Sequence, residues 1–321
     1  MRNRIIWAFA ACLSLFSLPL HAQQSSLPEK PVRLIVGGPP GGAPDTVARL
    51  LAQNMSLDQP VIVENKNGAA QMIAADFVAR SPADGTVLLL ASQTAIAVSP
   101  VLQKSALNPI KDFTGVGLVG EAPLVLVAGP SLTAGTVPEL IAYAKAHPEE
   151  LNFGHGGVGS TPHMAGVLFQ QATDTKLTNV PYPGEQASMI DIMAGRIHFM
   201  FANASSAIPH VKNGKLRALA ITSDSRTPSA PEIPTLNEAG IPGFSAATWL
   251  GIVAPAATPK AAIDQLNAEL NRVLSLPEIQ EKLAVHGFSI QATSPDQFNR
   301  FMLAEHEKWG KLIQDANIAI N

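Results

Sequence analysis

The sequence predicts an α/β fold with mainly parallel sheets, divided over two domains. Its 321 residues correspond to two units at roughly 150 residues each. From Val32 onward, short β-branched apolar runs alternate with turns rich in Gly, Pro, Ser and Thr and with segments whose apolar residues recur at helical spacing. Many strand segments are apolar throughout, as expected when helices cover both faces of a parallel sheet.

Short apolar runs predict seven strands. In chain order they are Val32–Val36, Val61–Glu64, Val87–Leu90, Leu124–Ala128, Leu177–Pro181, Ile197–Phe201 and Leu216–Thr222. The segment Leu151-Asn152-Phe153 is a further, shorter strand candidate.

Longer segments with apolar residues at helical spacing predict eight helices. They are Asp45–Asn54, Ala69–Arg80, Val137–Ala146, Thr161–Ala172, Gln186–Ala194, Ala261–Leu274, Pro277–His286 and Pro295–Gln314. A short helix is also expected at Thr94–Val101, and the proline-rich segment from Pro228 to Pro242 is predicted to be a loop.

The first 22 residues have the features of a secretory signal peptide. Two arginines precede an apolar run from Ile5 to Leu20, and the small residue Ala22 follows. A membrane-spanning helix needs about 20 apolar residues, so this shorter run favours a peptide that is cleaved after Ala22. Cleavage would also remove Cys12, the only cysteine of the chain. The exported protein would then have no disulfide, no cysteine nucleophile and no thiolate metal ligand.

The charge composition argues against nucleic acid as a partner. The chain has 22 Lys and Arg against 25 Asp and Glu, and 15% of its residues are charged. That fraction lies below the usual ~25%, and no basic run follows residue 4. Phosphate backbones are bound through clustered positive charge, which this sequence lacks.

Loops that follow strands are the candidate ligand sites, because ligands of open parallel sheets bind beyond the carboxyl ends of the strands. There the first turn of each following helix has unpaired N–H groups with partial positive charge. The first such loop, Gly37–Asp45, is rich in glycine and proline, so its backbone at Gly41, Gly42 and Ala43 can approach a ligand closely. Asp45 is expected either to cap its own helix or to contact the ligand.

The loop after the third strand offers two hydroxyls and an amide, from Ser92, Gln93 and Thr94. These groups could pair with a carboxylate or a hydroxyl of a ligand. Capping of the following short helix explains the two hydroxyls equally well.

A glycine-rich loop, Gly154–Gly159, follows a strand-like segment and precedes a helix, and it matches G-x-G-x-x-G. A dinucleotide-binding fold would have an acidic residue near the end of the next strand, but Leu177–Pro181 contains none. Ser160 and Thr161 at the cap, with Pro162 at the first helical position, instead predict an anion-binding helix N-terminus. We expect a free carboxylate as the anion and no cofactor.

Two histidines border this loop, His155 and His163. Their spacing across a turn matches no zinc motif, and no carboxylate accompanies them. A structural role is therefore favoured for both over a metal-binding or catalytic one.

Two further loops complete the set of candidate sites. One contains Tyr182 and Gly184, and the other contains Asn203 and Ser205; both lie at helix N-termini. Tyr182 could be a lid over the ligand or a core residue whose hydroxyl is satisfied.

The sequence has no visible catalytic machinery. It contains no G-x-S-x-G, no H-E-x-x-H and no Walker sequence. Arginine is also absent from every candidate loop, so amides and hydroxyls are expected to hold the anion reversibly. This pattern indicates a binding protein and not an enzyme.

Short characteristic blocks are spread along nearly the whole predicted mature chain. They are Pro31–Val36, Pro40–Asp45 with Ala48-Arg49, Val63-Glu64-Asn65, Asp84-Gly85, Lys111-Asp112-Phe113, Glu139-Leu140 with Ala144-Lys145-Ala146, Gly159-Ser160 with His163, Val180-Pro181-Tyr182 with Gly184, Gly214–Ala220, Pro234-Thr235 with Glu238-Ala239-Gly240, and Trp249 with Ala254-Pro255. In this order the blocks resemble the Bug-type substrate-binding proteins of tripartite tricarboxylate transporters.

The resemblance implies a periplasmic receptor with the type II periplasmic-binding-protein fold, in which two α/β lobes joined by crossing strands close like a Venus flytrap. Lobe one would comprise residues 23–124 and 248–321, and lobe two residues 125–247. The implied ligand is a small organic carboxylate. The implied partners are two membrane subunits of a secondary transporter, and the receptor itself would be a monomer.

The residues expected to bind the ligand lie in loops of both lobes, and no metal ligand is expected. They are Gly41, Gly42, Ala43, Asp45, Ser92, Thr94, Gly159, Ser160, Thr161, His163, Tyr182, Gly184, Asn203 and Ser205.

Two departures from the family pattern concern the walls of this site. Asn65 is followed by Lys66-Asn67-Gly68-Ala69, where the family often has Arg-Pro-Gly-Ala, and Asn108-Pro109 lacks the usual preceding tyrosine. Two alternatives remain open beside the transport receptor: a secreted hydrolase or isomerase acting on a small carboxylic acid, and a sensory protein that binds such an acid for a signalling partner.

Overall fold

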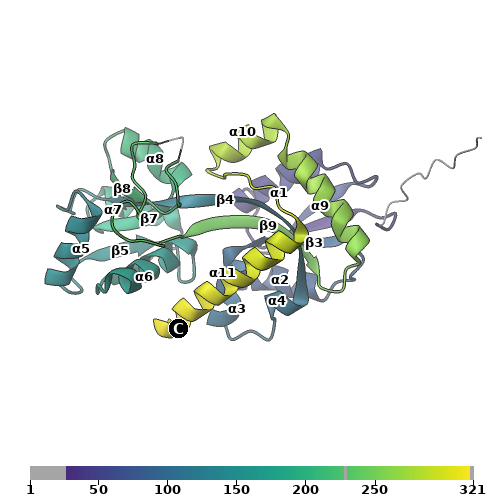
Figure 1. Ribbon diagram of the computed structural model, residues 1–321, viewed down its shortest axis with the longest axis horizontal. Coiled ribbons are helices and arrows are strands. Elements are labelled where there is room, and N and C mark those ends of the chain that lie inside the picture. The colour runs from purple at the N-terminus through teal and green to yellow at the C-terminus, as the bar shows by residue number, and fades with distance from the viewer. Residues whose placement is uncertain (1–26, 228–229, 319–321) are drawn as a thin grey trace, which may run out of the picture.

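The computed structural model describes residues 27–227 and 230–318, which form two α/β halves joined by two long strands (Figure 1). Lobe one contains the elements from β1 to α4 and from α9 to α11, and lobe two contains the elements from α5 to β8. The predicted signal peptide, residues 1–22, lies outside the described residues. Within the described ranges, no helix has both the length and the hydropathy needed to cross a bilayer.

Lobe one is built on three parallel strands. They are β1 (Val32–Val36), β2 (Val61–Asn65) and β3 (Val87–Ser92), with β1 paired to both neighbours. Its helical segments are α1 (Ala43–Asn54), the turn η1 (Ala69–Gln71), α2 (Met72–Ala79), the π-helical turn η2 (Thr94–Val98), α3 (Ser99–Leu102), α4 (Pro109–Asp112), α9 (Lys260–Leu274), α10 (Pro277–Val285) and α11 (Pro295–Asp315).

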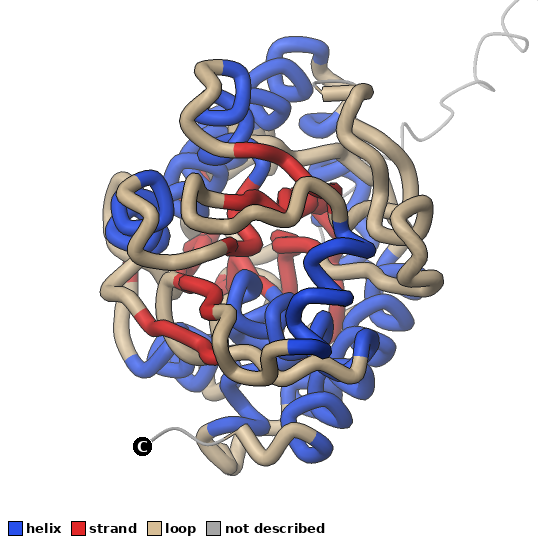
Figure 2. Tube along the Cα trace, turned by 90° about the vertical axis from the view of Figure 1, so that its left-hand side faces the viewer, coloured by secondary structure: helices blue, strands red, loops and turns tan. Residues whose placement is uncertain are grey.

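Lobe two repeats this arrangement around a second parallel group (Figure 2, where this lobe faces the viewer). Its strands are β5 (Asn152–His155), β6 (Thr178–Pro181), β7 (Phe199–Asn203) and β8 (Arg217–Ile221). Its helices are α5 (Val137–Ala146), α6 (Thr161–Thr173), α7 (Glu185–Met193) and α8 (Ala204–Lys212). β5 pairs in parallel with β6 and β7.

Two crossing strands join the lobes: β4 (Phe113–Ala128) and β9 (Ala247–Pro255). The first part of β4, up to Pro123, pairs with β9, and the second part, from Leu124, pairs with β7 and β8. All antiparallel strand pairs in the described ranges involve β4 or β9. The predicted parallel pairing is thus confirmed for the core of each lobe, and the antiparallel pairs arise where the chain crosses between lobes.

The sequence prediction missed β9 and the first part of β4. Gly115 and Gly120 interrupt the apolar pattern of β4 and resemble turn residues in the sequence. In the structure they let other segments lie directly on the strand: a Cβ at Gly115 would lie 2.8 Å from the Phe298 ring, and one at Gly120 would lie 2.6 Å from the Ser289 carbonyl oxygen. These glycines therefore mark close packing and not a chain reversal.

Several predicted helix bounds were also wrong. α1 begins at Ala43, before the predicted start, and each of the predicted helices 69–80 and 94–101 begins with an irregular turn that precedes the regular helix. Helix α8 follows the loop at Asn203 and Ser205, which was expected at a helix N-terminus, but no bounds were predicted for it. Pro209 lies inside this helix, and proline removes a helical hydrogen bond. The described part of the predicted loop 228–242 contains no helix or strand.

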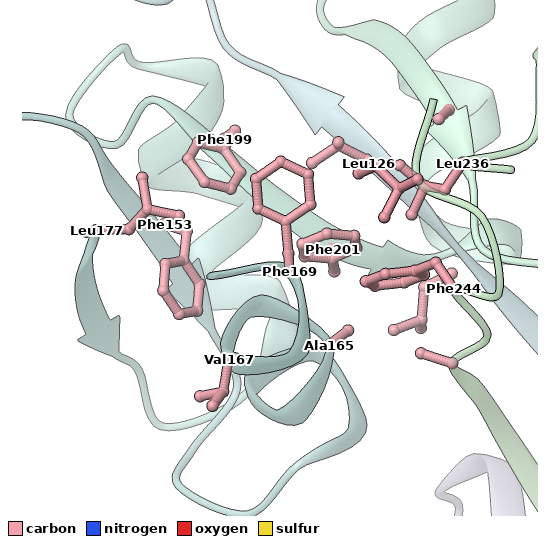
Figure 3. Packing of buried hydrophobic residues seen from close by; sticks show 14 of the residues in the cluster. Leu126, Phe153, Ala165, Val167, Phe169, Leu177, Phe199, Phe201, Leu236 and Phe244 are labelled. Carbon is pink, nitrogen blue, oxygen red and sulfur yellow. The ribbon is translucent and has the colours of Figure 1, made fainter. Parts of the chain in front are cut away.

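Aromatic residues fill the core of lobe two (Figure 3). Phe153, Phe169, Phe199, Phe201 and Phe244 come from β5, α6, β7 and the segment after β8, and their neighbouring ring centroids lie 5.9 to 6.3 Å apart. Rings at such distances add contact energy to the burial of their apolar area. This core fixes the strand ends from which the lobe-two loops emerge.

Helix α11 adds a third link between the lobes. Phe298 and Met302 near its start pack in the core of lobe one, whereas Trp309, Leu312 and Ile313 near its end pack in the core of lobe two. Figure 1 shows this helix running from the right-hand lobe beneath the left-hand one.

Candidate functional site

The loops predicted to bind the ligand lie at one edge of each lobe. In lobe one they follow β1 and β3, and in lobe two they follow β5, β6 and β7. Strand β2 runs parallel to β1 and ends at the same edge of lobe one. We call these two edges, which carry the carboxyl ends of the strands, the interlobe edges. Parallel strand ends with helix N-termini beyond them are the usual ligand position in this class of fold.

The lobe-two edge touches lobe one at one place and crossing strand β9 at another. At one, Thr161 Oγ1 donates a 2.5 Å hydrogen bond to Gln93 Oε1, and a Cβ at Gly159 would lie 3.0 Å from the Leu102 side chain. At the other, Thr248 Oγ1 on β9 donates to Asn203 Oδ1 at 3.3 Å. The structure therefore brings Gly159, Thr161 and Asn203 of lobe two against lobe one or the crossing strands.

Two predicted glycines border open space. A Cβ at Gly41 or at Gly184 would have no atom within 4 Å. Their φ angles are 79° and 126°, which a residue with a Cβ rarely adopts. The turns at these two positions are therefore accessible from outside the protein.

The loop after β1 is shaped by Asp45. Its carboxylate accepts hydrogen bonds of 2.9 Å from the backbone N–H of Gly41, from Asn65 Nδ2 and from Arg49 Nε. The residue is 3% exposed, and the bond from Arg49, followed by those from Gly41 and Asn65, lowers the pKa of Asp45 to about 2 against the opposing effect of burial. The N-cap of α1 is Gly42, so the expectation that Asp45 caps the helix was wrong. Asp45 instead lies in the first turn of α1, and its carboxylate closes the preceding glycine turn by accepting from the Gly41 N–H.

The structure also brings cations to this edge, which sequence reasoning missed. Arg49 reaches the loop because it lies four residues after Asp45 on the same helix face, and its Nη2 also lies 3.4 Å from Asn65 Oδ1. Lys66 follows Asn65, and its Nζ lies 4.1 Å from the centroid of the Phe77 ring. The i, i+4 spacing of Asp45 and Arg49 was the available signal for the first of these cations.

The end of β3 links three segments. Ser92 Oγ donates to Gln71 Oε1 at 2.8 Å and accepts from the N–H of Ala95 at 3.4 Å. The N-cap of the following turn is Gln93, so neither Ser92 nor Thr94 occupies the expected cap position. Thr94 begins the π-helical turn and is half-buried. Gln93 is 1% exposed, and its Nε2 has no hydrogen-bond partner among the described residues. Gln71 and Gln93 were absent from the predicted site residues.

The glycine-rich loop after β5 is bound to two neutral histidines. Nδ1 of His155 accepts from the N–H of Gly157, and Nδ1 of His163 accepts from the N–H of Gly159, both at 3.2 Å. Ser160 is the N-cap of α6, as predicted, and its Oγ donates to the Gly157 carbonyl at 2.7 Å. The histidines therefore hold the loop in place by accepting from its backbone N–H groups.

The surroundings of the histidines keep them uncharged. They are 0% and 3% exposed, and their ring centroids lie 4.4 Å apart. Burial, and then the neighbouring His155, lower the pKa of His163 to about 4, and burial also lowers the pKa of His155. A neutral imidazole that accepts at Nδ1 carries its proton on Nε2.

These bonds change the expected role of the loop amides. The N–H groups of Gly41, Gly157 and Gly159 already donate to side chains of this chain. The N–H of Gly42 donates to the Pro39 carbonyl. In this conformation the glycines therefore shape the loops, and side chains and other amides must supply the donors to a ligand.

The loop after β6 lies directly on the glycine-rich loop. A Cβ at Gly156 would lie 2.8 Å from the backbone nitrogen of Glu185. The Tyr182 hydroxyl donates to Asp191 Oδ2 at 2.8 Å, and its backbone N–H donates to the His155 carbonyl at 2.9 Å. Tyr182 is therefore bonded within its own lobe, as in the second of the two predicted roles.

The loop after β7 is organised by Glu185. Its carboxylate accepts from the N–H and Nδ2 of Asn203 and from the Ser206 hydroxyl. Ser205 is exposed and lies beside Gly287 after α10, where both residues line a cavity of about 350 Å³. The described residues contain no group of three or more His, Cys, Asp or Glu placed to hold a metal ion.

Residues 47–318 match the model of a protein family described as the tripartite tricarboxylate transporter family receptor. The chain is 36% identical to protein BugT of Bordetella pertussis, over 98% of this chain and 97% of that protein. It is 34% identical to a protein of Agrobacterium vitis from the TAR-I ttuE-ttuC' intergenic region, over 98% and 92% of the two chains.

Solved structures agree with these sequence matches. The protein Rpa4515 of R. palustris, solved with adipate, is 33% identical with a TM-score of 0.78, over 91% of this chain and 99% of that one. MatC of Rhodopseudomonas palustris, solved with bound malate, is 31% identical with a TM-score of 0.75, over 89% and 100%. The periplasmic binding protein BugD is 29% identical with a TM-score of 0.75, over 91% and 99%.

Proposed function

Because the chain belongs to the tripartite tricarboxylate transporter receptor family, we propose that it binds a small organic carboxylate between its lobes and delivers it to the membrane subunits of such a transporter. The family match over residues 47–318 carries this proposal. The adipate and malate named for two structures at 33% and 31% identity support a carboxylate as the ligand.

The charge of the lobe-one edge supports the same ligand class. Arg49 reaches the end of β2 from α1, and Lys66 directly follows β2. The Arg49 side chain is 49% exposed although it pairs with Asp45. A carboxylate approaching this edge would meet positive charge beside neutral hydroxyl and amide groups.

The proposed motion is closure of the lobes about the crossing strands. We assign residues 23–124 and 248–321 to lobe one and residues 125–247 to lobe two. The passage of β4 from one sheet to the other after Pro123 and the start of β9 at Ala247 support these boundaries. Hinged closure around a ligand is the motion expected of such an arrangement.

We further propose that the receptor acts in the periplasm after cleavage behind Ala22, as a monomer that engages two membrane subunits. The proposal includes no cofactor, no nucleic acid and no catalytic step. Of the predicted site residues, Ser92, Thr161, Tyr182 and Asn203 would act through the hydrogen bonds that shape the loops.

A ligand panel tests the proposal. Malate, succinate, adipate, citrate and benzoate are each added to the purified protein, and thermal unfolding is recorded. A ligand at 100 times its dissociation constant adds about 2.7 kcal/mol to the unfolding free energy, which is readily measured.

Three outcomes separate the proposed function from its alternatives. No stabilisation by any panel member would contradict it. Turnover of a panel member by the purified protein would favour a hydrolase or isomerase. Uptake of the bound acid that does not depend on this protein would favour a sensory role.

A further inference from the structure

The turn between β2 and α2 has an unusual backbone. Ala69, Ala70 and Gln71 follow one another with φ angles of 44°, 46° and 73°. A left-handed backbone is unfavourable for residues with a Cβ, and where it persists it is often part of a ligand site. Ala69 and Ala70 line a cavity of about 1080 Å³ together with Val158 of lobe two, so the turn lies at the interlobe edge.

Contacts from the neighbouring strands hold Gln71 in this conformation. Gly37, just after β1, lies against it so closely that a Cβ there would be 2.7 Å from Gln71 Cβ. Ser92, at the end of β3, donates to Gln71 Oε1 at 2.8 Å. Ser99 Oγ donates to the Ala70 carbonyl at 2.9 Å. The turn is therefore fixed to the ends of two parallel strands.

The bond from Ser92 also orients the amide of Gln71. Because Oε1 accepts from Ser92, the Nε2 donor must point away from β3. No hydrogen bond within residues 27–227 and 230–318 uses this Nε2, and the side chain is half-buried. A fixed donor without a partner thus lies where ligands of parallel sheets bind.

We propose that Gln71 determines ligand specificity, because its side-chain amide donates a hydrogen bond to an oxygen of the bound carboxylate. This inference rests on the proposed function and names a donor at the lobe-one end of the same site. The left-handed backbone at Gln71, although unfavourable, orients this donor toward the ligand.

Two substitutions of Gln71 and one control test the inference. Gln71→Glu keeps the shape and the acceptor for Ser92 but replaces the donor with a carboxylate oxygen. Gln71→Gly removes the donor and relieves the backbone. Ala70→Gly relieves the backbone of the same turn and leaves Gln71 intact, and Ala70 is exposed, so little packing is lost.

Binding is measured by calorimetry at pH 7.5 with the member of the five-acid panel that stabilises the unmutated protein most. We expect Gln71→Glu to weaken binding at least tenfold and Gln71→Gly to weaken it several-fold while raising Tm. Ala70→Gly should also raise Tm, with binding unchanged within twofold. A purely structural role for Gln71 would instead leave the affinity of Gln71→Gly unchanged.

The outcomes distinguish this inference from the proposed function. Binding by Gln71→Glu within twofold of the unmutated protein would overturn the inference alone. If Gln71→Glu does not fold, unchanged binding by Gln71→Gly would overturn the inference instead. Absence of binding by the unmutated protein would overturn the proposed function, and this inference with it.

Discussion

The glycine turns of the two lobes are held in place by chemically different acceptors. In each, a glycine N–H donates to the side chain four residues later: Gly41 to Asp45 in lobe one, and Gly159 to His163 in lobe two. The acceptor in lobe one is a carboxylate that also binds an arginine. In lobe two it is a neutral imidazole packed against a second imidazole, that of His155.

The difference lies in what surrounds each acceptor. Asp45 and His163 are both 3% exposed, but Arg49, the partner of Asp45, has a side chain that is 49% exposed. His155, the neighbour of His163, is fully buried. The lobe-one turn thus depends on an ion pair that water and salt can reach, and the lobe-two turn depends on rings that must stay uncharged. The two turns should respond differently to mutation, acid and salt.

Removal of His163 should have the largest effect. His163→Ala deletes a buried ring and leaves the N–H of Gly159 without its acceptor, so we expect a loss of about 3 kcal/mol in the unfolding free energy. Urea unfolding at pH 7.5 measures it. The exposed His147 provides the control, since His147→Ala should change stability by less than about 0.5 kcal/mol. Equal losses for the two variants would contradict the loop-binding role of His163.

Acid should destabilise the two turns in separate pH ranges. The folded-state pKa of His163 is about 4, below its ordinary 6.5, so the unfolded chain takes up this proton first as the pH falls. Between pH 6.5 and 4 the protein should therefore lose about 3 kcal/mol of stability through His163. Asp45, with a pKa of about 2 in place of 3.8, should contribute a smaller loss of about 2 kcal/mol between pH 3.8 and 2.

Unfolding free energies at several pH values in each range check this order. In His163→Gln the loss between pH 6.5 and 4 should become markedly smaller, and Asp45→Asn should leave that range unchanged. A loss in this range that persists in His163→Gln would show that another group is responsible.

Asp45→Ala should destabilise the protein by about 2 kcal/mol at pH 7.5. The substitution leaves the N–H of Gly41 and the amide of Asn65 without their charged acceptor, and buried donors without a partner are unfavourable. Asp45→Asn keeps one acceptor oxygen and should be less harmful, as measured by urea unfolding. An Asp45→Ala protein as stable as the unmutated one would mean that the turn forms without its carboxylate.

Arg49→Ala should have the smallest effect. The Asp45 carboxylate is buried but the Arg49 side chain is half exposed, and an ion pair that water reaches contributes little, so we expect Tm to fall by less than about 2 °C at low salt. In 1 M NaCl the difference from the unmutated protein should disappear, because salt screens exposed charges. The difference between His163→Ala and the unmutated protein should persist in the same salt. If the difference between His163→Ala and the unmutated protein disappeared in 1 M NaCl, the proposed contrast between the two turns would be contradicted.

The pattern of residues predicted the regular parts of the fold. Apolar runs identified β1, β3 and β7, and Ser160 before Thr161-Pro162 identified the start of α6. Strands β5 and β6 contain polar residues and were predicted from mixed segments. The family resemblance, confirmed by the family match, added the two-lobed arrangement. These features depend on local sequence patterns or on similarity along the whole chain.

The remaining features depend on contacts between distant residues. Glycines in β4 signal turns in the sequence because the helix packed on them lies far along the chain, as Phe298 on Gly115 shows. The left-handed turn at Gln71 is stabilised by Gly37 and Ser92, which no local pattern around it reveals. The place of Gln71 at the interlobe edge was missed for this reason. Arg49 was missed although its i, i+4 spacing from Asp45 was a local signal.

One carboxylate at the junction of the lobes gives the protein a built-in optical reporter. Glu305 on α11 accepts the indole N–H of Trp249 on crossing strand β9 at 3.0 Å and that of Trp309 on α11 at 2.8 Å. The chain has three tryptophans, and the third, Trp7, lies in the predicted signal peptide. The tryptophan fluorescence of the exported form would then originate wholly from this junction, so a shift of its emission on ligand addition would follow the hinge without any label.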